Sequence, residues 1–216
     1  KTLRAKRFIM SIVTLNDRAV RSVTTFGSIH TGSMVFIKKL TASSSATLSF
    51  VNGSSDVVFD STYKEYLFTF KDIHPQFDNV NFLFNGSDDD SSHSYDVTKT
   101  TTFFDARHSE AGSDADLTYR TANDLAQSTD FQMLSPNVGA GAADECTAGY
   151  LHIFNPSSTT LIKHFVSRFN VYHASNYSMD YHMAGFFNTT ADITAVQFKF
   201  NTGNTDSGDI SLYGIV

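Results

Sequence analysis

Tryptophan is absent from this chain of 216 residues, and cysteine occurs once, as Cys146. One thiol cannot form a disulfide within the chain, and it cannot supply the several thiolates of a cysteine-based metal site. Proline and glycine are also scarce, at 3 and 12 residues, which excludes collagen-like and low-complexity sequences. The stability of the protein must therefore come from the packing of its side chains.

Long apolar runs are missing as well. No segment approaches the roughly 18 consecutive apolar residues of a membrane-spanning helix, so we expect no membrane insertion. The basic N-terminal residues are not followed by a sustained apolar segment with a small-residue cleavage site, which argues against a signal peptide. Acids outnumber lysine and arginine by 22 to 16, and the resulting net charge of −6 disfavours nucleic acid as a partner.

Large rings are the most prominent feature that the sequence does contain. Phenylalanine occurs 20 times, and many of these rings alternate with small polar residues in short segments such as 48–51, 66–70 and 80–84. This alternation is typical of β-strands with one buried face. No long stretch keeps the apolar period of a helix. The sequence therefore predicts an all-β fold, an antiparallel β-sandwich that is jelly-roll-like.

Turn residues separate the predicted strands. Asn52-Gly53 is a strong hairpin signal, and it predicts that a strand at 46–51 returns as a strand at 57–59. The other predicted strands cover 34–40, 66–70, 80–84, 97–104, 150–154, 160–172, 179–187, 195–200 and 210–215.

Polar segments between the strands are predicted to be loops. Residues 88–94 are acidic, and 105–147 are rich in Asp, Ser, Ala and Gly. We interpret 105–147 as long loops with one or two short elements, including a helical turn at 122–127, and loops of that length usually have a function or are poorly ordered. Residues 201–208 form the connection between the last two strands.

The first part of the chain has a different charge from the rest, because basic residues are concentrated there and the acids lie mostly beyond Asp56. We divide the chain into an extended N-terminal arm, 1–29, and a β-sandwich domain, 30–216. Such an arm is not stable alone, so we expect it to pair with a neighbouring chain or to enter a larger assembly. A solvated basic tail is the alternative. The residues expected to make the assembly contacts are Arg7, Phe8, Ile12, Leu15, Arg18 and Arg21.

Several segments resemble structural proteins that marine tailed phages encode, including the phages of cyanobacteria. The sequence IVTLNDRAVRSVTTFGSI at 12–29 is similar to the start of those proteins, and NTGNTDSGDISLYGIV at 201–216 resembles their closing hairpin. Residues 38–70 and 152–165 also resemble this group, so the likeness covers most of the chain.

This resemblance implies a non-enzymatic structural component of a bacteriophage virion, as a tail-fibre or appendage module that contacts the host surface. The alternatives are a capsid decoration protein of the same virion and a carbohydrate-binding or depolymerising domain. The expected partners are other virion proteins, which the arm would contact. A homotrimer is expected, because phage fibre and decoration proteins commonly have threefold symmetry and a closed ring satisfies heterologous edges.

Four residues are predicted to contact a glycan of the host surface. Exposed tyrosine rings can stack on sugar rings, and a nearby carboxylate can hydrogen-bond to the sugar hydroxyls; the alternative is that these tyrosines are half-buried packing residues. The four residues are Tyr172, Tyr177, Asp180 and Tyr181.

Candidate metal ligands lack the spacing of known sites. His164, His173 and His182 lie near the C-terminal strands, but no two of them have the His-x-His or His-x-x-x-His spacing. The acidic run at 88–90 and the pair at 114 and 116 lack the regular spacing of a calcium loop. We therefore expect neither a metal nor a cofactor.

Catalytic motifs are missing from the sequence. It contains no nucleophile elbow, no glycine-rich phosphate loop and no His-Glu-x-x-His motif. Asp105, Glu110 and Asp180 are available for glycoside hydrolysis, which needs two carboxylates across a cleft, but nothing in the sequence pairs them. The sequence therefore predicts that the protein is not an enzyme.

Overall fold

The computed structural model describes residues 33–216, which form an all-β protein of antiparallel strand pairs. The predicted all-β antiparallel fold is confirmed. The predicted arm at 1–29 and its six assembly residues lie outside the described residues. Within 33–216 there is no helix of the length and apolarity that crossing a membrane requires. The strands are β1 (Met34–Thr41), β2 (Leu48–Val51), β3 (Glu65–Pro75), β4 (Val80–Ser87), β5 (Lys99–Ser109), β6 (Ala115–Tyr119), β7 (Gln132–Val138), β8 (Thr147–Phe154), β9 (Lys163–His173), β10 (Tyr177–Phe187), β11 (Ala195–Phe200) and β12 (Thr205–Ile215).

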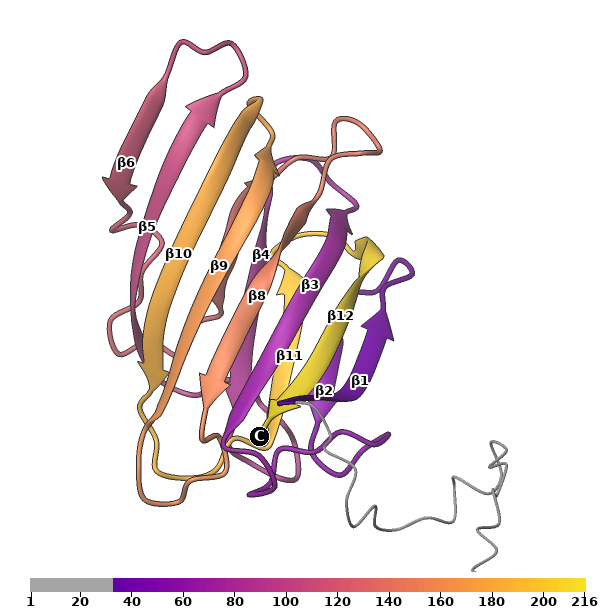
Figure 1. Ribbon diagram of the computed structural model, residues 1–216, viewed down its shortest axis with the longest axis vertical. Coiled ribbons are helices and arrows are strands. Elements are labelled where there is room, and N and C mark those ends of the chain that lie inside the picture. Colours follow the sequence, from indigo (N-terminus) through magenta and orange to yellow (C-terminus); the bar gives the residue numbers. More distant parts are fainter. Residues whose placement is uncertain (1–32) are drawn as a thin grey trace, which may run out of the picture. The chain divides into compact units, whose positions relative to one another are not determined.

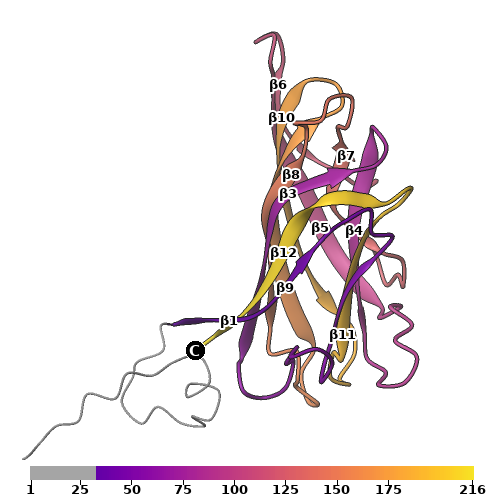
Figure 2. The same cartoon turned by 90° about the vertical axis from the view of Figure 1, so that its right-hand side faces the viewer.

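The strands lie in two layers that pack face to face (Figures 1 and 2). The larger layer has the order β1-β12-β3-β8-β9-β10-β5-β6, and the smaller layer has the order β2-β11-β4-β7. One residue pair, Val138 of β7 with His173 of β9, joins the two layers. The sheet is therefore nearly closed, and among the strands of residues 33–216 only β1, β2 and β6 have a single neighbour.

Strand β9 shows how the sequence positions its side chains. Phe165, Phe169 and Val171 are buried between the layers, while His164 and Arg168 are exposed on the other side. Because successive strand residues point to opposite faces, an apolar residue at every second position buries one whole face. The strand predicted at 160–172 is confirmed from Lys163 onward.

Phe198 of β11 lies at the centre of the core and is fully buried. Edge-to-face and tilted ring pairs are favourable beyond the area that they bury, and large rings fill the space between layers with few atoms left unpacked. The centroid of the Phe198 ring lies 5.0 to 6.5 Å from the ring centroids of Phe50, Phe68, Phe70, Phe82 and Phe84.

The predicted hairpin at Asn52-Gly53 is wrong in its second strand. The turn forms, because Gly53 has φ +74° and its N–H donates to the carbonyl of Val57 over 3.0 Å. However, 57–59 is not a strand, and β2 pairs with β11 instead. Phe59 is buried in the core, and its N–H donates to the side chain of Asn52 over 2.9 Å, so an amide side chain takes the place of a strand partner.

The prediction for 105–147 also needs correction. Strand β5 continues to Ser109, β6 and β7 are both strands, and residues 122–127 form turns and bends without a helix. Charged residues concealed the strands: Asp105 and Arg107 point toward the inner side of β5, where sequence reasoning expects apolar residues. Here polar pairs between strands take the place of apolar packing.

The last two strands do not form a hairpin with each other. Strand β11 pairs with β4 and β2 in the smaller layer, whereas β12 pairs with β3 and β1 in the larger layer. The predicted connection at 201–208 is too long, because β12 begins at Thr205, and residues 201–204 cross from one layer to the other. Strand β1 pairs with β12, from Met34 opposite Ile215 to Thr41 opposite Asp209, so the first and last described strands are neighbours.

Two lysines are fully buried opposite Phe187 of β10. The ammonium group of Lys99 donates to the carbonyls of Val97 (3.0 Å) and Asp130 (2.6 Å). The ammonium group of Lys163 donates to the carbonyls of Thr189 (3.1 Å) and Ala191. Burial lowers the pKa of both lysines, that of Lys99 to about 8. Each lysine therefore connects its strand to a loop by hydrogen bonds to backbone carbonyl groups.

Lys99 makes stability depend on pH. Its pKa is about 8 in the folded protein and about 10.4 in an unfolded chain. Between these values the unfolded chain holds the proton and the folded protein does not, so the free energy of unfolding rises with pH by up to about 3 kcal/mol. Urea unfolding of the wild type and of Lys99→Met at pH 7.5 and 9.5 isolates this effect from that of other groups. We expect the wild type to gain stability relative to the variant, and parallel pH curves would contradict the assignment.

Candidate functional site

The outer face of the larger layer, the side turned away from the smaller layer, carries two of the four predicted glycan contacts. Tyr172 and Asp180 lie on this face, since they alternate with the buried residues of β9 and β10. Tyr177 and Tyr181 point to the opposite side. Tyr181 is 3% exposed, so its predicted exposure is wrong: it shares its side of the strand with the buried Met179 and Met183.

Asp180 belongs to a polar cluster on the outer face. The guanidinium of Arg168 donates two hydrogen bonds to its carboxylate, over 2.9 and 2.7 Å, and these bonds hold the pKa of Asp180 below its usual value. The Nε2 atom of His182 lies 3.2 Å from the same carboxylate, and its ring stacks on Phe104 at 4.8 Å between centroids. Tyr150, 41% exposed, stands beside Arg168 on the neighbouring strand.

Both margins of the larger layer carry exposed apolar side chains. The first margin is β1, where Met34 and Phe36 are 50% and 57% exposed, and the second is β6, where Leu117 and Tyr119 are 70% and 50% exposed. Figure 1 shows these strands at opposite ends of the layer. All four side chains are on the outer face, because their strand partners point outward too.

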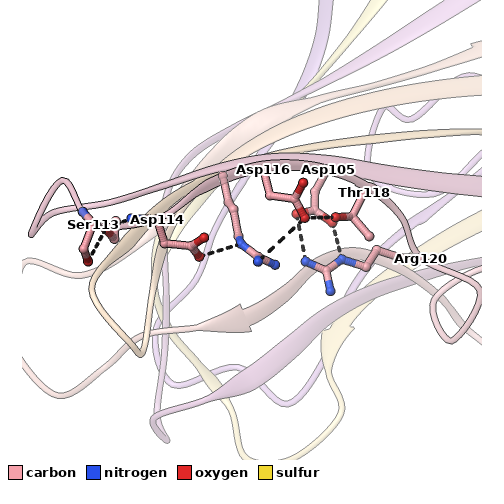
Figure 3. A network of polar contacts seen from close by, with 8 residues as sticks. Asp105, Ser113, Asp114, Asp116, Thr118 and Arg120 are labelled. Atoms are coloured by element: carbon pink, nitrogen blue, oxygen red, sulfur yellow. Dashed lines mark hydrogen bonds and ion pairs between the residues drawn. The ribbon is translucent and has the colours of Figure 1, made fainter.

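A network of ion pairs lies on the inner side of β5 and β6 (Figure 3). Asp105 is fully buried and accepts hydrogen bonds from Nε and Nη2 of Arg120, the second over 3.1 Å. The Nε of Arg107 donates to Asp114 over 3.0 Å, and its Nη2 lies 3.7 Å from Asp116. The hairpin thus replaces an apolar interior with compensated charges.

Hydrogen bonds within this network adjust its charges. The contact with Asp105 raises the pKa of Arg120, and a hydrogen bond from the hydroxyl of Thr118 lowers the pKa of Asp116. Ser109 fixes the turn of the hairpin, since its hydroxyl accepts from the N–H groups of Ser113 and Asp114, both over 3.1 Å. The lowered pKa keeps the carboxylate of Asp116 ionised beside Arg107.

Two of the three carboxylates considered for glycoside hydrolysis, Asp105 and Asp180, do not face each other across a cleft. Asp105 faces the inner side of the sheet and Asp180 the outer side, although they are at neighbouring positions of paired strands. Asp105 is also fully buried and bound to Arg120. These two groups therefore do not form the facing pair that glycosidases use.

The acidic loop at 88–94 is organised by one carboxylate. Asp89 accepts hydrogen bonds from the N–H groups of Ser92 and His93, both over 2.7 Å, and of Ser94, over 3.0 Å. These donors hold the pKa of Asp89 well below its usual value. In the described part of the chain, 33–216, no three His, Cys, Asp or Glu residues are grouped as metal ligands.

Sequence reasoning missed the inner ion pairs and the β6 margin. The signal was present, because Asp105, Arg107 and Ser109 recur at every second residue and continue the alternation of the strand before them. Leu117 and Tyr119 likewise alternate with polar residues. A short strand with polar residues on one face and apolar residues on the other is difficult to distinguish from a loop.

Comparison with protein-family models, with curated proteins and with solved structures finds no match to this chain.

Proposed function

We propose that this chain is a non-enzymatic structural module of a bacteriophage virion, most directly of a tail fibre or appendage, that assembles with copies of itself. The resemblance of 12–29, 38–70, 152–165 and 201–216 to structural proteins of marine tailed phages supports the virion. The exposed apolar residues at the two margins of the larger layer support the assembly.

We further infer that the sandwich is a jelly roll with two inserted strand pairs. If β5–β6 and β9–β10 are set aside, the pairs β1·β12, β2·β11, β3·β8 and β4·β7 remain, and each is nested in sequence within the one before. Consecutive strands of this set alternate between layers except at β4 and β7. Eight strands in two such layers are the pattern of jelly rolls, which occur in viral capsid and lectin domains.

The placement of apolar residues at both margins carries the assembly proposal. An isolated β-sandwich usually protects its edge strands with charged residues, since a free edge pairs with other chains. Here β1 also carries Lys38 and Lys39, but the exposed Phe36 on β1 and Leu117 on β6 place a large apolar side chain at each margin. The β1 margin of one copy would contact the β6 margin of the next, a heterologous contact that closes into a ring. We propose three copies, because threefold symmetry is common among phage fibre and decoration proteins.

Two charged variants test this arrangement. Phe36→Glu removes the β1 contact and Leu117→Glu removes the β6 contact, so each full-length variant alone should be monomeric by gel filtration with light scattering. An equimolar mixture should form a dimer, because each variant keeps the margin that the other has lost. Leu161→Glu is the matched control: Leu161 is 62% exposed but lies outside the strands, so this variant should keep the wild-type mass.

Two outcomes would contradict the arrangement. A wild type that stays monomeric at micromolar concentration excludes self-assembly. Dimers formed by either variant alone indicate a symmetrical contact of one margin with itself.

The place of the protein on the particle needs a separate observation. Antibody labelling of the particles of a phage that encodes this protein should mark the tail or its appendages in electron micrographs. Labelling of the capsid surface would favour the decoration protein, and particles without label would contradict the virion assignment.

A further inference from the structure

A pocket with a volume of about 410 Å³ opens beside the ion-pair network, on the inner face of the larger layer. This volume is typical of sites for small molecules. The exposed apolar residues of the two margins are on the outer face, so the pocket is separate from the proposed assembly contacts. Its principal lining residues are Arg107, Asp114, Arg120, His173, Tyr177 and Met179.

The two guanidinium groups of the pocket are held in place and keep unused donors. Arg120 is bound through Nε and Nη2, and Arg107 through the same two nitrogens, to carboxylates of β5 and β6 or the turn between them. Within residues 33–216, Nη1 of neither arginine makes a hydrogen bond. A ligand oxygen would meet donors whose orientation is already fixed, which lowers the entropy cost of binding.

The pocket also offers a further donor and an acceptor. Nδ1 of His173 accepts the N–H of Ser175 over 3.0 Å, and burial lowers the pKa of His173, so at neutral pH its ring is uncharged and carries its proton on Nε2. Oδ2 of Asp114 binds Arg107, while its Oδ1 makes no hydrogen bond within residues 33–216. The lining therefore combines donors with an acceptor.

Charge and apolar surface limit which ligand fits. Each arginine is already paired with a carboxylate, so the lining has no surplus positive charge to attract an anion. Tyr177 and Met179 add an aromatic ring and a thioether. A molecule that has several hydroxyl groups, an apolar C–H face and no net charge matches this combination.

We propose that this pocket binds one ring of an uncharged sugar, with Arg107, Arg120 and His173 donating to its oxygens, Asp114 accepting from a hydroxyl, and Tyr177 packing against its C–H face. This site goes beyond the structural role and does not depend on it. It also differs from the predicted contact site, of which only Tyr177 lines the pocket.

The first test uses the full-length wild type labelled with ¹³C at its methionine methyl groups. Methyl glycosides of glucose, galactose and mannose are added in turn, and methyl glucuronide is the charged comparison. We expect at least one neutral glycoside to shift the methyl signal of Met179. The dependence of this shift on glycoside concentration should give a Kd in the millimolar range. The signal of Met34, at the β1 margin, should not shift.

A pair of variants then assigns the site. Arg107→Met should weaken binding of the neutral glycoside at least tenfold, since a donor of the pocket is lost. Arg168→Met is the matched control, because it breaks another arginine–aspartate pair, on the outer face, and should leave the Kd unchanged. Thermal unfolding of both variants verifies that they are folded.

The proposal is overturned if no neutral glycoside shifts the Met179 signal of the wild type. Tighter binding of the glucuronide than of every neutral glycoside overturns the inferred charge of the ligand. Equal weakening by both arginine substitutions overturns the position of the site. None of these outcomes depends on the oligomeric state, so the assembly proposal is tested independently.

Discussion

Phe198→Ala should lower the free energy of unfolding by about 3–5 kcal/mol, because it leaves a cavity where five other phenylalanine rings meet. These rings come from both layers, so the surrounding strands cannot collapse onto the space without separating from their sheet partners. Urea unfolding followed by circular dichroism measures the loss.

The matched control for this substitution is Phe77→Ala. Phe77 is 48% exposed and lies outside the strands, so removing its ring should cost less than about 1 kcal/mol. Similar losses for the two variants would mean that the packing of the two layers around Phe198 is not the main source of stability.

Arg120→Ala alone should lower the free energy of unfolding by about 3–5 kcal/mol, because it leaves the buried carboxylate of Asp105 without a partner. The expected loss of stability comes from the unpaired buried charge of Asp105 and not from the lost attraction between the two side chains. The double variant Asp105→Leu/Arg120→Met should therefore recover much of it, since neither residue is then charged.

The control for the ion pair is Arg168→Ala. Arg168 also donates two hydrogen bonds to Asp180, but the arginine side chain is 55% exposed. When this side chain is removed, water can hydrogen-bond to the carboxylate of Asp180 in its place. We expect a loss of less than about 1 kcal/mol. If the double variant were no more stable than Arg120→Ala, the desolvated charge would not be the cause.

Much of the fold could be predicted because its strands follow a strict two-residue period. In β9 the alternation of Phe165 and Phe169 with His164 and Arg168 is sufficient to assign both faces. The same rule, applied to β10, would have placed Tyr181 inside with Met179 and Met183. The prediction grouped Tyr181 with the other tyrosines as a surface on which sugar rings stack, although its position in the strand indicated burial.

Other features could not be read from the sequence. The alternation of β5 is the same whether Asp105 faces water or a buried guanidinium, and only the return of the chain at Arg120 decides between them. The pairing of β2 with β11 joins segments that are remote in sequence, and the strong local turn at Gly53 favoured a nearby partner instead. Lys99 and Lys163 resemble surface residues until the loop carbonyls that bind them are placed.

The pairing of β1 with β12 affects the time at which the protein can fold. Each of the nested pairs joins distant parts of the chain, and the outermost joins residue 34 to residue 215. Contacts of such high sequence separation slow folding to milliseconds or seconds in small β-proteins, because loop entropy is lost before the contact is made. During synthesis β1 and β3 leave the ribosome long before β12, so both must remain without their common neighbour until β12 has been translated.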